Sequence, residues 1–468
     1  MLASEDLAFA GLAEQAELVR RGEVSSRELT ELSLSRIERL DPQLNAFRVV
    51  LAERAIEEAE RADGRRTAGG EGALLGVPIA VKDNVDVAGE VTTHGTGAHE
   101  GAAINDSHVV RRLREAGAVI VGKTNLPELA IWPFTESETW GLTRNPWDPS
   151  RSPGGSSGGS AVAVAAGMVA VAHASDGGGS IRIPAACCGL FGLKAQRGRV
   201  SLMPDAEHWY GLSVFGCLSR TVLDSALFYD VVHGHVEGDA HSAPEPRSSF
   251  TEAARMAPGR LRIAFSTKPI QPGPVAGEVR KAVHDTAELL RSLGHEVVER
   301  DPSWGFQLPA FLPRYLAGIR DDVARMPHPE RLEQRTRRLA SFGERLRRRP
   351  LRRALAAEHK HAQRLGEVFA EFDVLMTPAM ARLPVEAGRW HGKGTVATVN
   401  GISRYVPFTS PWNVTGQPAA AVPAGFSAEG LPLSVQLVGR PADETTLLSL
   451  SAQLEAERPW SDRRPPVS

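Results

Sequence analysis

Residues 175–190, SDGGGSIRIPAACCGL, contain three consecutive glycines that run directly into Ser180. Glycine adopts backbone conformations that other residues avoid, but it loses more entropy when it becomes ordered. A glycine triplet is therefore either a slack linker or a turn whose backbone has a task. The preceding run VAVAHAS, at 169–175, has the apolar character of a buried strand. The triplet thus follows the end of a predicted strand.

Helix and strand patterns alternate along the rest of the chain. Helical spacing at 7–22 predicts one helix, and a capping box of Ser25 and Glu28 predicts another that ends at Asp41–Pro42. Further patterns predict strands at 76–84, 118–122, 261–265, 295–299, 372–376 and 432–439, and helices at 108–116, 160–167, 278–293 and 444–455. This alternation favours an α/β sheet with helices on both faces.

The bulk composition excludes several classes of protein. The 468 residues carry a formal net charge of -2. The protein therefore has no strong overall electrostatic field of the kind that would indicate binding to nucleic acid or to a membrane. The N-terminus is acidic, unlike a signal peptide, and no apolar run is long enough to span a bilayer. The three cysteines, Cys187, Cys188 and Cys217, form neither a disulfide framework nor a zinc spacing. We expect a soluble cytoplasmic protein, either a monomer or a homodimer.

Arginines crowd into the segment 312–365, where leucines recur at helical spacing among acidic residues. This pattern favours solvated helices that form a cap or insertion over a nucleic-acid site. His233 with His235 and His359 with His361 resemble metal-ligand pairs, but neither pair has a third ligand at a familiar spacing. We therefore expect no metal and no cofactor.

The segment GAVIVGKT, at 117–124, satisfies the expression of a phosphate-binding loop. Such a loop needs a flexible backbone that enters a helix, whereas the four residues between its glycines prefer a strand interior. Leu126 and Pro127 follow where the helix should continue. We interpret the match as accidental.

The segment GGSSG, at 154–158, satisfies the nucleophile-elbow expression of α/β-hydrolases. That motif requires an apolar strand before its serine. The preceding residues NPWDPSRSP contain three prolines and cannot form a central strand. An esterase of this class remains an alternative that depends on a histidine later in the chain.

Three polar features could carry chemistry: Lys82 at the end of an apolar strand, the pair Ser156–Ser157, and Ser180. A serine hydroxyl needs a base during attack, and His173 lies on a strand face where packing is the better interpretation. Burial lowers the pKa of a lysine by several units, which would make Lys82 a base. The simpler alternative is a surface ion pair of Lys82 with Asp83 or Asp86.

The glycine triplet could have a catalytic function if its backbone amides face the substrate. A tetrahedral intermediate needs hydrogen-bond donors at its oxyanion, each contributing about 2.7–4 kcal/mol. No side chain prevents the N–H groups of Gly177, Gly178 and Gly179 from turning inward.

Several segments resemble the amidase signature family. They are GVPIAVKDN, GKTNLPELA, PGGSSGGSAVAVAAG, SDGGGSIRIPAACCGLFGLK, GRVS, FDVLMTP, FTSPWNVTGQPAAAVPAGF and GLPLSVQLVGR. The resemblance implies a Ser-cisSer-Lys triad: Ser180 as the acylated nucleophile, Ser156 after a cis peptide bond as the proton relay, and Lys82 as the base. It also implies an oxyanion hole of four amides, those of Gly177, Gly178, Gly179 and Ser180.

The fold implied by the resemblance is an α/β/α sandwich around a mixed sheet of about eleven strands. We expect a single domain over 1–468, a catalytic core at 60–225 and a helical insertion at 300–370. The usual family run TDTGGS is SDGGGS here, so a side chain is missing at Gly177 and the acyl pocket is expected to be roomier or looser. Ala195 replaces a usual proline. Cys187 and Cys188 are expected to pack as small apolar residues.

The substrate is expected to be a small amide, with esters and carbamates (urethanes) as further candidates. Trp132, Phe134, Trp209 and Tyr210 are candidates for an apolar substrate pocket, with core packing as the alternative. A glutamine-dependent amidotransferase subunit that supplies ammonia is a second functional alternative. The sequence contains no clear residue for a polar glutamine pocket, which favours a free-standing hydrolase.

Overall fold

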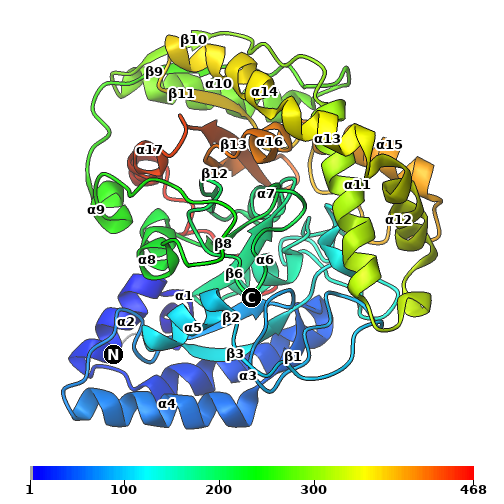
Figure 1. Ribbon diagram of the computed structural model, residues 1–468. Helices are drawn as coiled ribbons and strands as arrows, with labels where there is room; N and C mark the ends of the chain where they lie inside the picture. The colour runs from blue at the N-terminus through cyan, green and yellow to red at the C-terminus, as the bar shows by residue number, and fades with distance from the viewer. Residues whose placement is uncertain (1–3) are drawn as a thin grey trace.

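The computed structural model describes residues 4–468, and its centre is a pair of mixed sheets (Figure 1). The five-stranded sheet has the order β1 (Phe47–Val50), β3 (Val119–Thr124), β2 (Pro78–Lys82), β6 (Val171–Asp176) and β8 (Val214–Ser219). β2 is parallel to both of its neighbours, while β1 and β8 run antiparallel at the two edges.

The six-stranded sheet has the order β10 (Glu296–Glu299), β9 (Arg262–Phe265), β11 (Val374–Pro378), β13 (Pro432–Val438), β12 (Ala419–Phe426) and β7 (Gly192–Lys194). A bridge between Phe191 and Ser219 joins the two sheets, with Phe191 N donating to Ser219 O over 3.0 Å. Together they supply the eleven expected strands. A separate two-stranded ribbon consists of β4 (Glu136–Ser137) and β5 (Gly141–Leu142).

Helices cover both sides of the sheets, as the alternation predicts (Figure 1). They are α1 (Ser4–Phe9), α2 (Leu12–Arg21), α3 (Ser26–Leu44), α4 (Ala52–Thr67), α5 (His108–Glu115), α6 (Gly158–Ala165), α7 (Arg182–Cys188), α8 (Val222–Val232), α9 (Phe250–Arg255), α10 (Gly277–Ser292), α11 (Leu308–Arg325), α12 (Gln334–Leu346), α13 (Arg349–Ala356), α14 (Glu358–Gly366), α15 (Thr395–Ser403), α16 (Pro411–Thr415) and α17 (Glu444–Glu457).

Two helix predictions at the N-terminus need correction. The segment 7–22 is not one helix, because the Asp224 carboxylate accepts a hydrogen bond from Ala13 N at 3.0 Å and caps a new helix, α2. The Ser25–Glu28 capping box is present, but α3 continues past Pro42 to Leu44. Proline removes only one hydrogen bond there, and Asn45 ends the helix in a left-handed conformation with φ 51°.

Strand β2 is buried along its whole length, and its alternate residues enter different parts of the core. Ile79 and Val81 join one hydrophobic cluster, while Ala80 joins another. Successive side chains of a strand point to opposite faces, so Lys82 lies on the same face as Ala80. Helix α6 packs against β2 and follows the serine pair 156–157. The fold therefore brings the end of β2 close to these serines.

Residues 119–124 of the segment that matches a phosphate-binding loop form the buried strand β3, and no helix follows this strand directly. Likewise, residues 152–157 contain no strand before Ser156, so the nucleophile-elbow geometry is absent from this described part of the chain. Neither segment therefore has the local structure that its motif requires.

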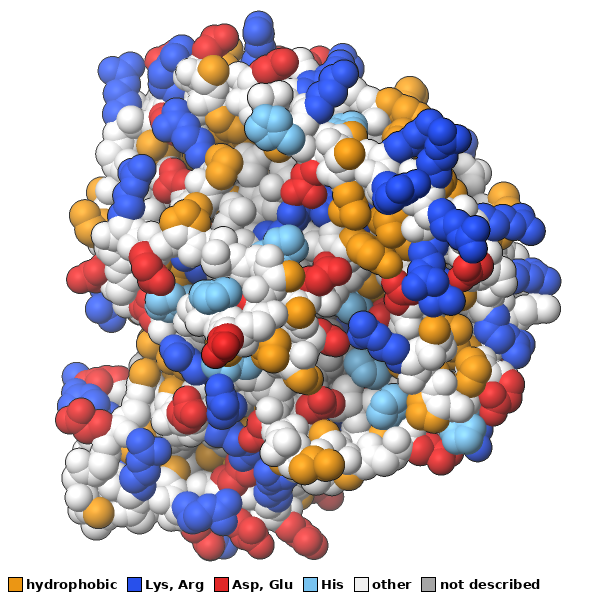
Figure 2. All heavy atoms as spheres, in the orientation of Figure 1, with side chains coloured by type: hydrophobic (Ala, Val, Ile, Leu, Met, Phe, Trp, Pro, Cys, Tyr) orange, Lys and Arg blue, Asp and Glu red, His pale blue; other side chains and the backbone are white. Residues whose placement is uncertain are grey.

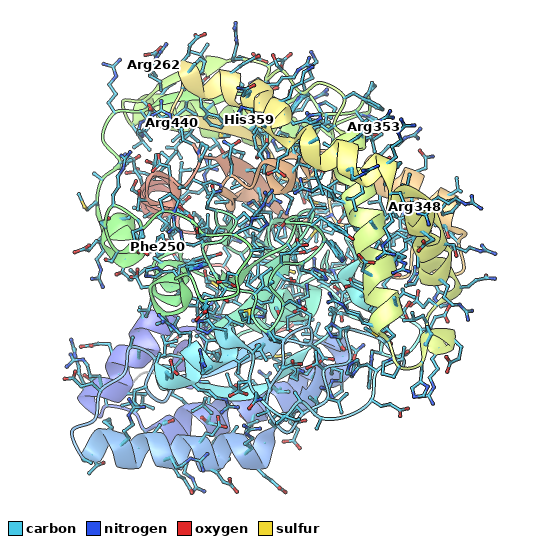
Figure 3. The ribbon with its side chains drawn as sticks, in the orientation of Figure 1. Phe250, Arg262, Arg348, Arg353, His359 and Arg440 are labelled. Atoms are coloured by element: carbon cyan, nitrogen blue, oxygen red, sulfur yellow. The ribbon has the colours of Figure 1, made fainter. Side chains whose placement is uncertain are left out.

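The arginine-rich segment is helical as predicted and forms α11–α14 along one side of the molecule (Figure 1). Blue basic side chains crowd on this side in Figure 2, and Arg348 and Arg353 project from its outer edge in Figure 3. Among residues 4–468, no group of three potential ligands could hold a metal ion. No helix in the same range is long and apolar enough to cross a bilayer.

Candidate active site

The carboxyl ends of β2 and β6 meet at one edge of the five-stranded sheet. These strands are parallel neighbours, with Ala80 opposite Ala172. Lys82 is the last residue of β2, and Ser175 lies near the end of β6. Ligands of open α/β sheets bind at such carboxyl ends. The glycine triplet follows β6 directly, so it belongs to the same edge.

The Lys82 amine lies among three hydroxyl groups. Its Nζ is 2.7 Å from Ser156 Oγ, 3.0 Å from Ser157 Oγ and 2.8 Å from Ser175 Oγ. The side chain is completely buried. Because all three partners are neutral, hydrogen bonds rather than an ion pair hold the amine.

The alternative of a surface ion pair for Lys82 is wrong. Asp83 instead contacts Lys123, with 2.8 Å between Nζ and Oδ1, and Arg48 at 3.2 Å. Asp86 accepts a hydrogen bond from Thr92 Oγ1 at 2.7 Å. Both carboxylates adjacent in sequence to Lys82 therefore have other partners.

Burial lowers the pKa of Lys82 to about 7, and the charge of Asp176 only partly opposes this shift. Removing an amine from water disfavours its charged form. At neutral pH the two protonation states of Lys82 are therefore similarly populated, so the amine can both accept and return a proton.

The Gly155–Ser156 peptide bond is cis, as the resemblance implies. Gly155 lies tightly against neighbouring backbone: a Cβ at this position would be 2.8 Å from Phe134 N and 3.0 Å from Trp132 O. Only glycine fits this approach. The close packing positions Ser156 next to Lys82.

A buried ionic network supports the loop 177–180. Asp176 accepts hydrogen bonds from Arg182 at 2.9 and 3.0 Å and from Asn413 Nδ2 at 2.8 Å. Burial alone would raise the pKa of Asp176, but Arg182 and these hydrogen bonds hold it below its usual range. Asp176 is therefore a fixed negative charge beneath the loop.

The amide of Gly179 is not a free donor, which corrects one member of the expected oxyanion hole. Gly179 N donates to Asp176 Oδ1 over 2.7 Å. Gly179 has φ +134°, which orients its peptide toward the carboxylate. Within residues 4–468, the amides of Gly177, Gly178 and Ser180 donate to no protein acceptor. These three remain available.

Ser180 lies between the glycine triplet and α7 and is 9% exposed. No hydrogen bond to its Oγ is formed by any residue in the described range 4–468. Thr409, from the loop before α16, donates through Oγ1 to Gly178 O at 2.6 Å and closes this side of the loop. The Ser180 hydroxyl is thus free to meet a ligand.

Three of the four predicted substrate-binding aromatics have packing or polar partners within the protein. Trp132 and Phe134 are core residues whose rings stack 5.7 Å apart, and Phe134 also stacks on Trp390 at 4.6 Å. The Tyr210 hydroxyl donates to Asp321. These interactions occupy the aromatic groups in packing.

Trp209 does border the loop, and it overturns the expectation of a roomier pocket. A Cβ at Gly177 would lie 2.8 Å from Trp209 Cε3. The indole ring therefore fills the space that the missing side chain would leave.

Two aromatics of α11 were missed by the sequence analysis. Phe311 reaches the loop, since its Cζ would lie 3.3 Å from a Cβ at Gly178. Its ring stacks on Tyr315 at 5.3 Å, and Tyr315 meets Trp209 edge-on at 5.0 Å. The spacing of 311 and 315 by one helical turn was the available signal, but it does not show which distant loop they contact.

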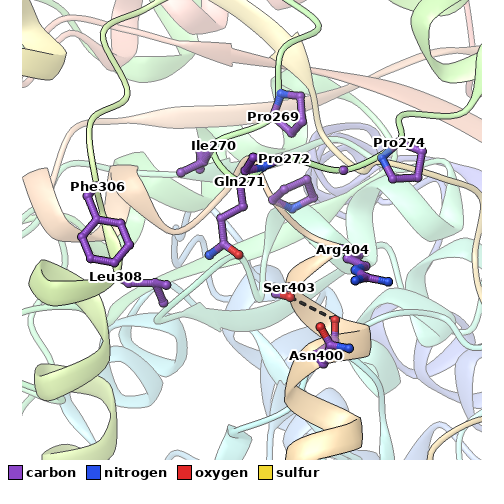
Figure 4. Close-up of a pocket in the computed structure, with 12 residues that line it drawn as sticks. Pro269, Ile270, Gln271, Pro272, Pro274, Phe306, Leu308, Asn400, Ser403 and Arg404 are labelled. Atoms are coloured by element: carbon purple, nitrogen blue, oxygen red, sulfur yellow. Dashed lines mark hydrogen bonds between the residues drawn. The ribbon is translucent and has the colours of Figure 1, made fainter.

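A pocket of about 330 Å³ opens next to these elements (Figure 4). It is lined by the segment 269–274, by Phe306 just before α11, by Leu308 at the start of α11, and by residues of α15 and the loop after it. Leu308 is one helical turn from Phe311, and Pro407 is two residues from Thr409. The pocket thus adjoins the same two segments that contact Gly178.

His173 is packed rather than poised as a base. It is completely buried, and Phe215 meets its ring edge-on at 4.9 Å. Burial and the nearby Lys82 lower its pKa to about 3, so the ring is neutral at pH 7.

Cys187 and Cys188 are buried as expected, and burial raises the pKa of the Cys187 thiol to about 12. A thiolate nucleophile is therefore not available at Cys187.

The chain is similar to known proteins over nearly its whole length. The family profile described as Amidase matches residues 28–448. The chain is 52% identical to "Putative amidase AmiB2" of Mycobacterium tuberculosis (strain ATCC 25618 / H37Rv), over 99% of both chains. It is 36% identical to the 6-aminohexanoate-cyclic-dimer hydrolase of Pseudomonas sp. (strain NK87), over 96% of this chain and 95% of the relative.

Two solved structures are similar over nearly their whole lengths. A 6-aminohexanoate cyclic dimer hydrolase superposes with a TM-score of 0.93 at 34% identity, covering 98% of this chain and 99% of the other. A bacterial aryl acylamidase of the amidase signature family superposes with a TM-score of 0.88 at 27% identity, covering 98% of each chain. This protein therefore belongs to the amidase signature family.

Proposed function

We propose that the chain is a hydrolase that cleaves the C–N bond of small amides through Ser180, Ser156 and Lys82. One observation carries the proposal: a completely buried amine with a pKa near 7 lies 2.7 Å from the Ser156 hydroxyl. A lysine in these surroundings is suited to accept a proton at neutral pH.

In the acylation step, Ser180 Oγ attacks the carbonyl carbon of the amide. Its proton passes to Ser156 Oγ, and the proton of Ser156 passes to Lys82 Nζ. The amides of Gly177, Gly178 and Ser180 donate hydrogen bonds to the oxyanion. Such preorganised donors act on the charge that develops in the transition state.

Collapse of the tetrahedral intermediate requires a proton on the leaving nitrogen. The Lys82 ammonium returns its proton through Ser156 to that nitrogen, the C–N bond breaks, and an ester remains on Ser180. Water then attacks the ester. Its proton passes through Ser156 to Lys82, and Lys82 returns a proton through Ser156 to Ser180 Oγ as the acid is released. A pKa near 7 suits both the base and the acid role.

The substrate proposal rests on the apolar surroundings of the loop. Phe311, Tyr315 and Trp209 form aromatic contacts beside the glycines. The adjoining pocket contains Leu308 of α11, Phe306 before it and apolar residues of the segment 269–274. Relatives with names that refer to a cyclic amide dimer and to aryl acylamides support small amides. Aryl esters and carbamates are proposed as side substrates because they form the same acyl-enzyme.

The main alternative is a glutamine-dependent amidotransferase subunit. Release of ammonia from glutamine by the purified chain alone would favour it. An esterase that uses Ser156 in a nucleophile elbow has little support, because no strand precedes this serine in the described chain. Inactivation by replacement of a single late histidine would revive that alternative.

The experiment that tests the proposal compares wild type with Ser180→Ala on a panel of p-nitroanilides, aryl esters and aryl carbamates. We expect turnover of anilides by wild type, loss of at least about 10³-fold in the variant, and an acyl adduct on the peptide that contains Ser180. Unchanged turnover in a folded Ser180→Ala variant would overturn the nucleophile assignment.

We further propose a single domain with its catalytic core at 60–225 and a helical insertion at 300–370, which corresponds to the region of α11–α14. The cytoplasm is the proposed location, because all three cysteines are buried and unpaired.

A further inference from the structure

We propose that Trp209, fixed in place by Asp322, limits the size of the substrate group that lies beside Gly177. This inference rests on the proposed amidase function, and it deepens that function by naming the residue that sets substrate size. The inference follows from the contacts that hold the indole ring in place and from the space beside Gly177 that its removal would open.

The indole lies between two glycines from distant parts of the chain. A Cβ at Gly177 would be 2.8 Å from Cε3 and 2.9 Å from Cζ3 of Trp209, while a Cβ at Gly318 on α11 would overlap with its Cδ1. Real Cβ atoms do not approach neighbours this closely. Glycine at both positions is therefore what allows the ring to reach the oxyanion loop.

Polar contacts fix the other edge of the ring. Trp209 Nε1 donates to Asp322 Oδ2 over 2.7 Å. His208 approaches the same carboxylate at 3.2 Å, and its other ring nitrogen is 2.8 Å from Ser213 Oγ. Ser213 also faces Gly177, since its Oγ would be 3.0 Å from a Cβ there. The carboxylate on α11 thus sets the depth to which the indole enters.

The backbone of Trp209 also depends on these contacts. Trp209 has φ 53° and Tyr210 has φ 56°, in the left-handed region that bulky residues rarely adopt. Such conformations persist only where surrounding contacts hold them. The Trp209–Asp322 bond and the contact of Tyr210 with Asp321 are suited to this role, which makes Asp322 a positioning residue.

The ring is part of a continuous aromatic wall. Tyr315 meets it edge-on at 5.0 Å and stacks on Phe311, which reaches Gly178. Replacing Trp209 by alanine would leave a space next to the first amide of the loop without touching Lys82, Ser156 or Ser180. Larger substrate groups would then fit, whereas the smallest would lose a contact.

The test measures kcat/KM for two series of anilides. In the first series the acyl group grows from acetyl to butyryl, hexanoyl and benzoyl on p-nitroaniline. In the second series the acyl group is always acetyl and the aryl amine grows. For Trp209→Ala and Trp209→Phe we expect the ratio of large to small substrates to rise in one series, by at least about tenfold for alanine. Ratios within twofold of wild type in both series and both variants would overturn the proposal.

The matched control is Trp460→Ala. Trp460 is 5% exposed, as is Trp209, and its Nε1 donates to Arg220 O at 2.8 Å. Both substitutions therefore remove a buried, hydrogen-bonded indole, but only one indole contacts the glycine loop. The size ratios of Trp460→Ala should stay at wild-type values. An equal change in this control would assign the effect to general loosening and overturn the proposal.

A stability cycle tests the packing without any substrate. Gly177→Ala should lower Tm in wild type, and most of that loss should disappear when Trp209 is also alanine. A loss of Tm that is independent of Trp209 would overturn the packing relationship.

Asp322→Asn should shift the size ratio in the same direction as Trp209→Phe. If wild type hydrolyses no anilide, the proposed function fails, and the proposed limit on substrate size fails with it. The Tm values of the Gly177 and Trp209 variants would still show whether the indole packs against Gly177.

Discussion

The Arg182 guanidinium contacts both carboxylate oxygens of Asp176, with 2.9 Å between Nη2 and Oδ1 and 3.0 Å between Nε and Oδ2. Both side chains are completely buried. Arg182 also donates to Thr409 O and Asn413 Oδ1, and Asp176 accepts from the Gly179 amide. One ion pair therefore connects the glycine loop to the segment that precedes and begins α16.

Asp176→Asn tests this connection. The substitution leaves a buried guanidinium without its counter-charge, and breaking a buried pair in this way costs about 3–5 kcal/mol of unfolding free energy. It also weakens the anchor of Gly179, so kcat should fall. Urea unfolding and anilide hydrolysis measure the two effects. The exposed pair of Arg20 with Glu17 is the control, and Arg20→Met should change neither quantity measurably.

Lys82 predicts the pH dependence of activity. Its pKa is lowered by burial to about 7, and the proposed relay needs the neutral amine. The kcat/KM for an anilide should therefore rise with pH, with a midpoint near 7, and level off above it. A flat profile between pH 6 and 8 would contradict the role of Lys82 as base. Lys82→Met should be inactive at every pH.

The same shift predicts how stability depends on pH. The amine has a pKa of 10.5 in the unfolded chain and about 7 in the folded protein. Between these values the unfolded chain binds more protons, so this residue makes the folded state more stable as pH rises. Below pH 7 the penalty for burying the amine is fully present. The stability advantage of Lys82→Met over wild type should shrink as pH increases from 7 toward 10, and chemical unfolding at three pH values measures it.

The parts of the fold that were predicted correctly are those with strong local patterns. β2 and β3 are runs of apolar residues, and the capping box of Ser25 and Glu28 is complete. β12 was missed because its sequence AAAVPAGF is rich in alanine and contains Pro423, which falls where the register of the strand shifts. The sequence of this segment alone does not show that the sheet can accommodate a proline, which has no backbone N–H to donate to the neighbouring strand.

The residues of the candidate site also differ in how far the sequence could indicate them. Lys82 was found because a charged residue at the end of an apolar strand is conspicuous, and the structure provides the hydroxyl partners. For Trp132 and Phe134 the sequence left substrate binding and core packing open, because an aromatic residue near a motif has the same sequence signature in both cases, and the structure shows both rings buried and stacked. Phe311 was missed because its contact with Gly178 joins segments 133 positions apart, counted from the two residue numbers.

Gly179→Ala separates backbone strain from local crowding. Gly179 has φ +134°, and a Cβ there would lie 2.6 Å from both Ile183 Cδ1 and Thr409 Oγ1. Gly234 has a similar φ of +128°, but a Cβ there would meet nothing within 4 Å. Both alanine variants carry backbone strain of about 1–3 kcal/mol. Only Gly179→Ala should lose activity, by at least about 10²-fold, because the crowding displaces the loop. Equal activity losses in the two variants would contradict a specific role of the loop.

Leu308→Trp tests whether substrates use the pocket between α11 and α15. Leu308 lines this pocket and is 37% exposed, so the larger ring would reduce its volume without disturbing the core. We expect KM for the larger anilides to rise several-fold, with kcat for the smallest nearly unchanged, since the relay residues are not touched. Val396→Trp is the control because Val396 lies on α15 outside the pocket lining and is 80% exposed. If the two tryptophan variants have the same KM values across the series, substrates reach Ser180 by another route.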